Sequence, residues 1–291
     1  MLPSALPFPA RVALTLRTLA GLSTAEIARA LLTAEPALAQ RLVRAKRKIQ
    51  EAGIPYRVPP AELLPERLAA VLAVLYLIFN QGYDEQDPQR DLTAEAIRLA
   101  RTLVRLMPAE PEPHGLLALM LLHEARQETR TQDGVLVTLE DQDRSRWDQS
   151  LIAEGVATLD KALAMRSAGP YQLQAAIAAC HATAPDPAST DWPQIKALYA
   201  ELARLTPSPV VDLNRAVAVA MADGIPAGLA LVDELTASGR LSGYHLLPAT
   251  RADLLRRAGR VTEARVAYKE ALELAPTEAE RRYLSKRRRD P

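Results

Sequence analysis

The chain has 291 residues, a net charge of +1, 48% hydrophobic residues and only 4% aromatic residues. It is long enough to bury a full core, and its single cysteine, Cys180, excludes an internal disulfide. No run of about 18 uncharged apolar residues occurs, which excludes a transmembrane helix and predicts a cytoplasmic protein with no membrane partner. Because Ala and Leu dominate the composition, we expect helices packed through small and branched aliphatic side chains.

The charge is unevenly distributed along the chain. Residues 1–60 hold nine Lys and Arg against three Glu, a net +6, so the remaining 231 residues carry −5. This asymmetry indicates a nucleic-acid partner for the first segment only.

Three short helices are predicted near the N-terminus, over residues 10–20, 24–31 and 35–51. Gly21 has the position of a residue that ends a helix in the left-handed conformation. Ser23 and Glu26 have capping-box spacing, in which each side chain accepts a hydrogen bond from the backbone N–H of the other residue. A short helix, a turn and a longer basic helix are typical of a helix-turn-helix unit that binds DNA.

The third predicted helix has an apolar stripe and a cationic face on the other side. The stripe recurs at helical spacing and consists of Leu38, Leu42, Ala45 and Ile49. We expect the cationic face to enter the major groove, with Gln40, Arg41 and Arg44 reaching base edges. Arg47 and Lys48 are expected to contact phosphates. The alternative interpretation is a solvated basic helix without a DNA partner.

Two stretches of this unit match a known family. They are Gly-Leu-Ser-Thr-Ala-Glu-Ile-Ala-Arg-Ala-Leu at residues 21–31 and Ala-Gln-Arg-Leu-Val-Arg-Ala-Lys-Arg-Lys-Ile at residues 39–49. They resemble the fourth conserved region of extracytoplasmic-function sigma factors. The resemblance implies recognition of the promoter −35 element in double-stranded DNA and contact with the RNA polymerase core. Ala39 and Val43 depart from the residues that many relatives carry there, which leaves the promoter sequence open.

The resemblance begins at this fourth region. Sigma factors place another helical region ahead of it, and only about ten residues precede the first predicted helix here. A truncated factor and a natural remnant are both compatible with the sequence.

A proline-rich stretch at residues 54–65 predicts a linker. It divides the chain into a DNA-binding helix-turn-helix domain, residues 1–57, and a helical domain, residues 58–291. The expected fold class is therefore all-α.

The second domain shows internal repetition. Three predicted helices that end in proline align with one another, over residues 96–108, 195–207 and 264–276. Pro207 and Pro276 are 69 residues apart, which is two tetratricopeptide periods of about 34 residues. Such helix pairs stack into a curved solenoid whose usual partner is a protein or peptide.

One segment interrupts the helical pattern. Asp133 and Gly134, followed by residues 135–139, predict a turn into a short strand, as in a small hairpin. The charged residues 140–148 are expected to pair with each other where this loop meets the next helix, rather than to act as general acids and bases.

No catalytic residue, cofactor site or metal site is predicted, and the protein is not expected to be an enzyme. Cys180 lies in an apolar context that favours a small buried thiol. The four histidines, His114, His123, His181 and His245, lack ligand spacing. No glycine-rich phosphate loop or nucleophile elbow occurs.

Four stretches of the second half resemble the subgroup of these sigma factors that ends in a tetratricopeptide-like domain: residues 75–83, 139–148, 169–179 and 207–220. The most distinctive are Asn80-Gln81-Gly82-Tyr83 and the polar run from Asp141 to Asp148. Why those polar residues are needed does not follow from the sequence.

The sequence therefore predicts a transcription-initiation protein that combines −35 DNA recognition and RNA polymerase contact with a regulatory or protein-binding repeat domain. One alternative is a helix-turn-helix regulator that senses a peptide or small ligand and binds a palindromic site as a dimer. A second is an interaction scaffold whose basic helix packs against the repeats and never meets DNA.

Overall fold

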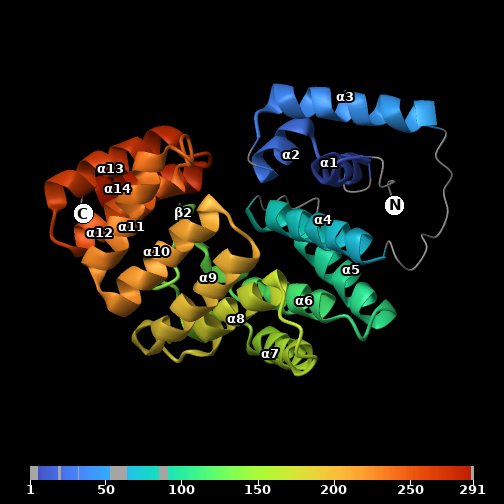
Figure 1. The fold of residues 1–291 in the computed structure, drawn as a ribbon. Coiled ribbons are helices and arrows are strands. Elements are labelled where there is room, and N and C mark those ends of the chain that lie inside the picture. The colour runs from blue at the N-terminus through green and yellow to red at the C-terminus, as the bar shows by residue number, and fades with distance from the viewer. Residues whose placement is uncertain (1–5, 19–20, 32, 53–63, 85–90, 290–291) are drawn as a thin grey trace.

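The computed structural model describes residues 6–18, 21–31, 33–52, 64–84 and 91–289. The described part is all-α apart from one short hairpin, as the composition predicts (Figure 1). None of its helices is long and apolar enough to cross a membrane. The predicted linker falls largely on residues 53–63, which lie outside the described residues, and the next helix begins at Leu64.

The first three helices form where the sequence predicts them: α1 (Phe8–Thr18), α2 (Thr24–Ala30) and α3 (Glu35–Ala52). Gly21 has φ 65°, the left-handed conformation expected of a helix-ending glycine. The capping box at the start of α2 is complete, because Glu26 N–H donates to Ser23 Oγ at 3.1 Å and Ser23 N–H donates to the Glu26 carboxylate.

Eleven further α-helices follow an arc in Figure 1. They are α4 (Leu64–Asp84), α5 (Leu92–Leu106), α6 (Pro111–Glu124), α7 (Gln149–Ala164), α8 (Pro170–Thr183), α9 (Trp192–Leu205), α10 (Pro209–Asp223), α11 (Ile225–Ser238), α12 (Leu246–Arg257), α13 (Val261–Leu274) and α14 (Glu278–Arg289). Each contacts the next along the chain, as expected of stacked helix pairs.

Several even-numbered helices lie together on the inner side of this stack. Besides their sequence neighbours, α4 contacts α6, α6 contacts α8, and α10 contacts α12. Helices on the concave side of a curved stack converge in this way, whereas those on the convex side spread apart. The three proline-ended helices that align in sequence are α5, α9 and α13, which all belong to the odd-numbered set.

The interruption between α6 and α7 is a hairpin, as predicted. Strand β1 (Thr131–Gln132) pairs antiparallel with β2 (Val135–Leu136) through a two-residue turn. Asp133 and Gly134 at the turn have φ values of 53° and 71°, and two successive positive φ angles are what a type I′ hairpin turn requires.

A single apolar cluster connects α1–α3 with the first repeat helices. It includes Leu16, Ile27 and Leu38 of the N-terminal unit together with Phe79 of α4 and Met120 of α6, all nearly inaccessible to solvent. Helix α4 packs against both α1 and α2. The N-terminal unit is thus held by the same buried core as the start of the repeats.

Gly82 explains part of the distinctive Asn80–Tyr83 motif. A Cβ atom there would lie 2.8 Å from Leu92 Cβ and 2.8 Å from the backbone nitrogen of Thr93. Because real Cβ contacts are longer, only glycine permits the close approach of α4 to the start of α5.

Candidate functional site

The apolar stripe predicted for α3 packs inward. Leu38, Leu42 and Ala45 are buried, and Ile49 packs against the same cluster. These contacts hold α3 on α1 and α2 and fix which of its faces meets solvent.

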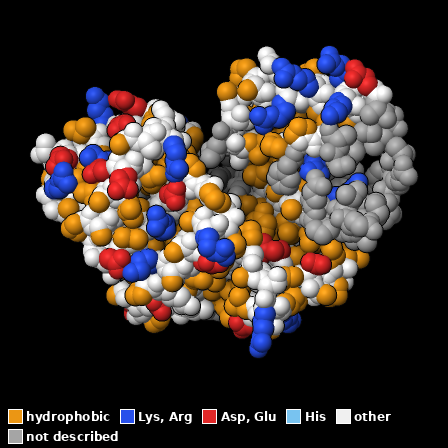
Figure 2. Space-filling view, viewed as in Figure 1, with side chains coloured by type: hydrophobic (Ala, Val, Ile, Leu, Met, Phe, Trp, Pro, Cys, Tyr) orange, Lys and Arg blue, Asp and Glu red, His pale blue; other side chains and the backbone are white. Residues whose placement is uncertain are grey.

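The predicted DNA-reading residues lie on the outside of α3. Gln40, Arg44, Arg47 and Lys48 are exposed, and Arg41 is half-buried. Arg47 Nε lies 3.5 Å from Glu51 Oε1, a pair so exposed that it contributes little and can exchange for a phosphate contact. Lys and Arg side chains gather along this helix in the space-filling view (Figure 2).

Val43 is a member of this face that the sequence analysis did not select. Its side chain is 67% exposed and lies between the turns that carry Gln40 and Arg47. If α3 enters a major groove as predicted, an exposed aliphatic side chain at this position is suited to contact a thymine methyl group. Position 43 falls outside the buried stripe, so helical spacing places it on the outer face although its residue type is apolar.

Helix α3 is not covered by the repeats. Its substantial helix contacts are with α1 and α2 alone among the described elements, and Figure 1 shows it along the outer edge of the molecule. The scaffold alternative requires Arg41 and Arg44 to be buried against acidic repeat residues, and neither residue has such a partner in the described part of the chain.

A second polar site is formed by residues 127–148, here called the inner segment, which crosses the concave side of the stack. At its start Gln127 Nε2 donates to the carbonyl oxygen of Tyr83 at 3.3 Å, and the Arg130 guanidinium donates to the same oxygen. Arg130 also lies 3.8 Å from the centre of the Tyr83 ring. Tyr83 of the distinctive motif therefore anchors the inner segment to the end of α4.

A buried hydrogen-bonded chain holds the middle of the inner segment. Trp147 Nε1 donates to Thr129 Oγ1 at 3.0 Å, and the single proton of that hydroxyl is shared between the carbonyl oxygen of Arg126 at 2.9 Å and Gln142 Oε1 at 3.1 Å. Gln142 Nε2 donates in turn to the carbonyl of Val137 at 3.2 Å. Buried polar groups are stabilising only when paired, so these residues specify one path for the segment.

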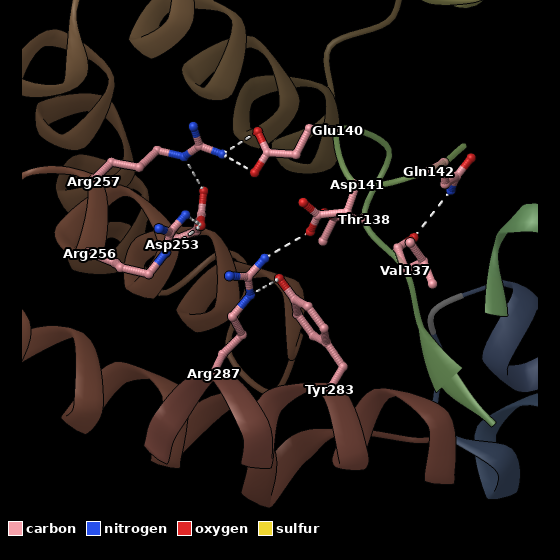
Figure 3. A network of polar contacts seen from close by, with 10 residues as sticks. All are labelled: Val137, Thr138, Glu140, Asp141, Gln142, Asp253, Arg256, Arg257, Tyr283 and Arg287. Carbon is pink, nitrogen blue, oxygen red and sulfur yellow. Dashed lines mark hydrogen bonds and ion pairs between the residues drawn. The ribbon is translucent and has the colours of Figure 1, made fainter. Parts of the chain in front are cut away.

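The charged residues of the inner segment do not pair with each other as predicted. Glu140 accepts two hydrogen bonds from Arg257 Nη2 of α12, at 2.6 and 2.7 Å, and Asp141 accepts one from Arg287 of α14 at 3.0 Å (Figure 3). Arg257 also donates to Asp253 at 2.6 Å. Burial lowers the pKa of Arg257, but the hydrogen bonds that it donates to the two carboxylates outweigh this effect and raise that pKa. The prediction was wrong because the partners come from remote helices.

The remaining polar residues of the motif satisfy backbone groups. Arg144 Nη1 donates to the carbonyls of His181 and Ala184 at the C-terminus of α8, both at 2.7 Å. Asp148 caps the first turn of α7 through Ser150 N–H and Leu151 N–H. The polar run therefore serves to tie the inner segment to α7, α8, α12 and α14.

Cys180 is half-buried, not fully buried as predicted. Its thiol donates a weak hydrogen bond to Gln194 Oε1 at 3.3 Å. Burial, with Asp191 nearby, raises the pKa of the thiol, which keeps it protonated and unreactive.

His181 makes the stability of the repeats depend on pH. Burial, assisted by Arg126 and Arg144, lowers its pKa to about 4. The unfolded chain binds a proton at this site between about pH 6.5 and 4 and the native state does not, so the free energy of unfolding falls as the pH falls through this window. We expect this histidine to account for about 3 kcal/mol of that loss.

Urea denaturation of the wild type and of His181→Asn at several pH values measures this contribution. The variant is expected to show a shallower decline between pH 6.5 and 4. Parallel pH profiles for the two proteins would contradict the assignment to His181.

Two family models match separate parts of the chain. Residues 4–49 match the model of Sigma-70, region 4, and residues 67–163 match a family of unknown function, DUF6596. An uncharacterized protein of Rhizobium meliloti (strain 1021) is 49% identical over 285 residues, which cover 96% of this chain and 67% of that protein. No solved structure matches the chain.

The region 4 match coincides with α1–α3 and their exposed cationic face, and region 4 domains bind DNA rather than catalyse reactions. The DUF6596 match covers α4–α6, the inner segment and nearly all of α7. The chain therefore belongs to the family of this Rhizobium meliloti protein, and it is a sigma-factor-like protein whose N-terminal helix-turn-helix is a Sigma-70 region 4 domain.

Proposed function

We propose that this protein acts in transcription initiation by recognising a promoter −35 element with α3 and by contacting RNA polymerase core through the same N-terminal unit. The observation that carries this proposal is the outer face of α3, on which Gln40 and Arg44 are exposed and Arg41 is half-buried. In the proposal these three side chains reach base edges. Arg47 and Lys48 would hold the helix on the phosphate backbone. The match to region 4 supports both partners.

In this proposal residues 1–57 are the DNA-binding unit and residues 58–291 are a tetratricopeptide-like regulatory domain. The paired helices, the curved inner surface and the 69-residue spacing of two aligned helices support the repeat interpretation. The shared apolar core between α1–α3 and α4 provides a physical route by which events at the repeats reach the DNA-binding helix.

Selection of bound duplexes from a library with a random central sequence tests the proposal. The full chain, at low ionic strength, is expected to enrich one short asymmetric motif, because a single helix-turn-helix reads one half-site. Its affinity should fall steeply with added salt and rise when RNA polymerase core is present.

Two other outcomes would be informative. A palindromic motif with half-sites about one helical turn apart would favour the dimeric regulator. Absence of any enriched motif, with and without polymerase, would contradict promoter recognition.

A further inference from the structure

A cavity of about 290 Å³ lies on the inner side of the stack, against the inner segment. Its walls come from α6 and α8, with Trp147 and Leu139 of the inner segment on one side. Tyr76 of α4, Tyr199 of α9 and Asn214 of α10 complete the lining. No carboxylate is among the lining residues of the described chain.

Among the described residues, the cavity contains one charge without an opposite partner, the guanidinium of Arg126. Its Nη2 hydrogen-bonds His123 Nδ1 at 3.0 Å, and its carbon lies 5.8 Å from the centre of the Tyr83 ring. No carboxylate of the described residues pairs with it. Burial lowers the pKa of Arg126, yet an arginine stays protonated in a protein. A buried cation without an anion is costly, and an anionic ligand would offset that cost.

His123 adds a neutral donor beside this charge. A guanidinium can only donate hydrogen bonds, so His123 Nδ1 must accept and the ring proton must lie on Nε2. Burial, with Arg126 and Arg130 nearby, lowers the pKa of His123 well below its usual range, which keeps the ring neutral. The cavity therefore presents an arginine and an imidazole N–H but only one positive charge.

Apolar side chains form part of the other walls. Leu119, Leu122 and Ile177 line the cavity together with Trp147, and the neutral polar side chains of Gln174 and Asn214 lie among them. The apolar side chains suit an aliphatic or aromatic body, and Arg126 with His123 suits a single charged head. An extended peptide is less well suited, because the inner segment already occupies the concave side where a peptide would lie.

A neighbouring cavity of about 300 Å³ provides an internal comparison. It shares Leu139 and His181 with the first, and its Arg257 is matched by Glu140 and Asp253. Its second arginine, Arg144, donates to the carbonyl oxygens of His181 and Ala184. Two carboxylates therefore line that cavity and repel an anion, whereas none is among the described residues that line the first.

We propose that the cavity at Arg126 binds a small organic monoanion, with its acidic head on Arg126 and His123 and its apolar body against Leu122, Ile177 and Trp147. This site shares no residue with the proposed DNA-binding face, so its test is independent of the test of promoter recognition. It makes the repeat domain a receptor for a free acid rather than only a protein-binding surface.

Two dyes with nearly the same aromatic body test the proposal on the full chain. The probe 8-anilinonaphthalene-1-sulfonate carries an anionic head, whereas N-phenyl-1-naphthylamine lacks it. The wild type is expected to bind the sulfonate more tightly than the neutral dye. Arg126→Met should weaken the sulfonate roughly tenfold and leave the neutral dye unchanged.

The matched control is Arg146→Met, which removes one exposed guanidinium from the inner segment outside the cavity. It should change neither dissociation constant. Equal sulfonate affinity in the wild type and Arg126→Met, or no sulfonate binding by the wild type, would overturn the proposal.

A further variant distinguishes loss of the charge from collapse of the cavity. If Arg126→Met binds neither dye, Arg126→Lys is measured next, because it keeps the charge and most of the side-chain volume. Preference for the sulfonate in Arg126→Lys supports the proposal, and loss of that preference overturns it.

Discussion

Replacing Arg41 and Arg44 together by alanine is expected to lower the affinity for the selected duplex by about 100-fold or more. Both residues lie outside the buried apolar stripe of α3, where Arg44 is exposed and Arg41 is half-buried. Each arginine that reaches a base edge contributes roughly 1–3 kcal/mol of discrimination, and the loss should be larger for the selected sequence than for a scrambled one. Fluorescence anisotropy with both duplexes at fixed salt measures the difference.

The matched control is Arg98→Ala with Arg105→Ala on α5. These two arginines are exposed and their loss removes the same total charge, but α5 does not contact α3 among the described helix contacts. We expect the control to keep its preference for the selected duplex. Equal losses in both double variants would mean that only net charge matters and would contradict base reading by α3.

Arg47 provides an internal contrast on the same helix. Because Arg47 is proposed to contact a phosphate, Arg47→Ala should lower the affinity for the selected and scrambled duplexes alike and reduce the salt dependence by about one counterion.

Trp147→Ala is expected to lower the free energy of unfolding by about 3–5 kcal/mol. The side chain is only 4% exposed and packs with Leu122, Ala125 and Ile152, while its indole N–H donates to Thr129. Its removal leaves a cavity and also takes a donor from the buried chain that holds the inner segment. Trp147→Phe should lower the free energy of unfolding by about 1 kcal/mol, because it keeps an aromatic ring and removes the N–H donor.

Urea denaturation followed by far-UV circular dichroism measures these losses. The other tryptophan, Trp192, is half-buried with its ring 5.2 Å from that of His181, and Trp192→Ala should cost about 1–2 kcal/mol. If Trp147→Ala were no more destabilising than Trp192→Ala, the inner segment would not be held as the structure indicates.

The elements that the sequence predicted well depend on residues close together in the chain. The capping box of Ser23 and Glu26, the stripe on α3 and the turn at Asp133 and Gly134 each involve neighbours within a few turns. Backbone conformation and helical spacing are local properties, so residue types at fixed offsets reveal them. The helices α5, α9 and α13 align for the same reason, since equivalent positions in a stack have equivalent burial.

The polar motifs could not be explained in this way. Glu140 and Asp141 find their partners 117 and 146 residues further along the chain, at Arg257 and Arg287. Tyr83 binds Arg130, which is 47 residues away. Residue types show that these side chains are polar. They do not show which of the many oppositely charged residues lies next to each of them in the folded chain.

By itself the sequence determined the all-α class, the three N-terminal helices, the exposed cationic face of α3 and its likeness to sigma region 4, because periodicity, capping and short motifs are local. Only the tertiary structure decided that α4 shares a core with α1 and α2, that residues 127–148 cross the inner surface, and that Arg126 lines a cavity in which no described carboxylate pairs with it. Those features arise from the curvature of the stacked helices, which is set by many distant contacts acting together.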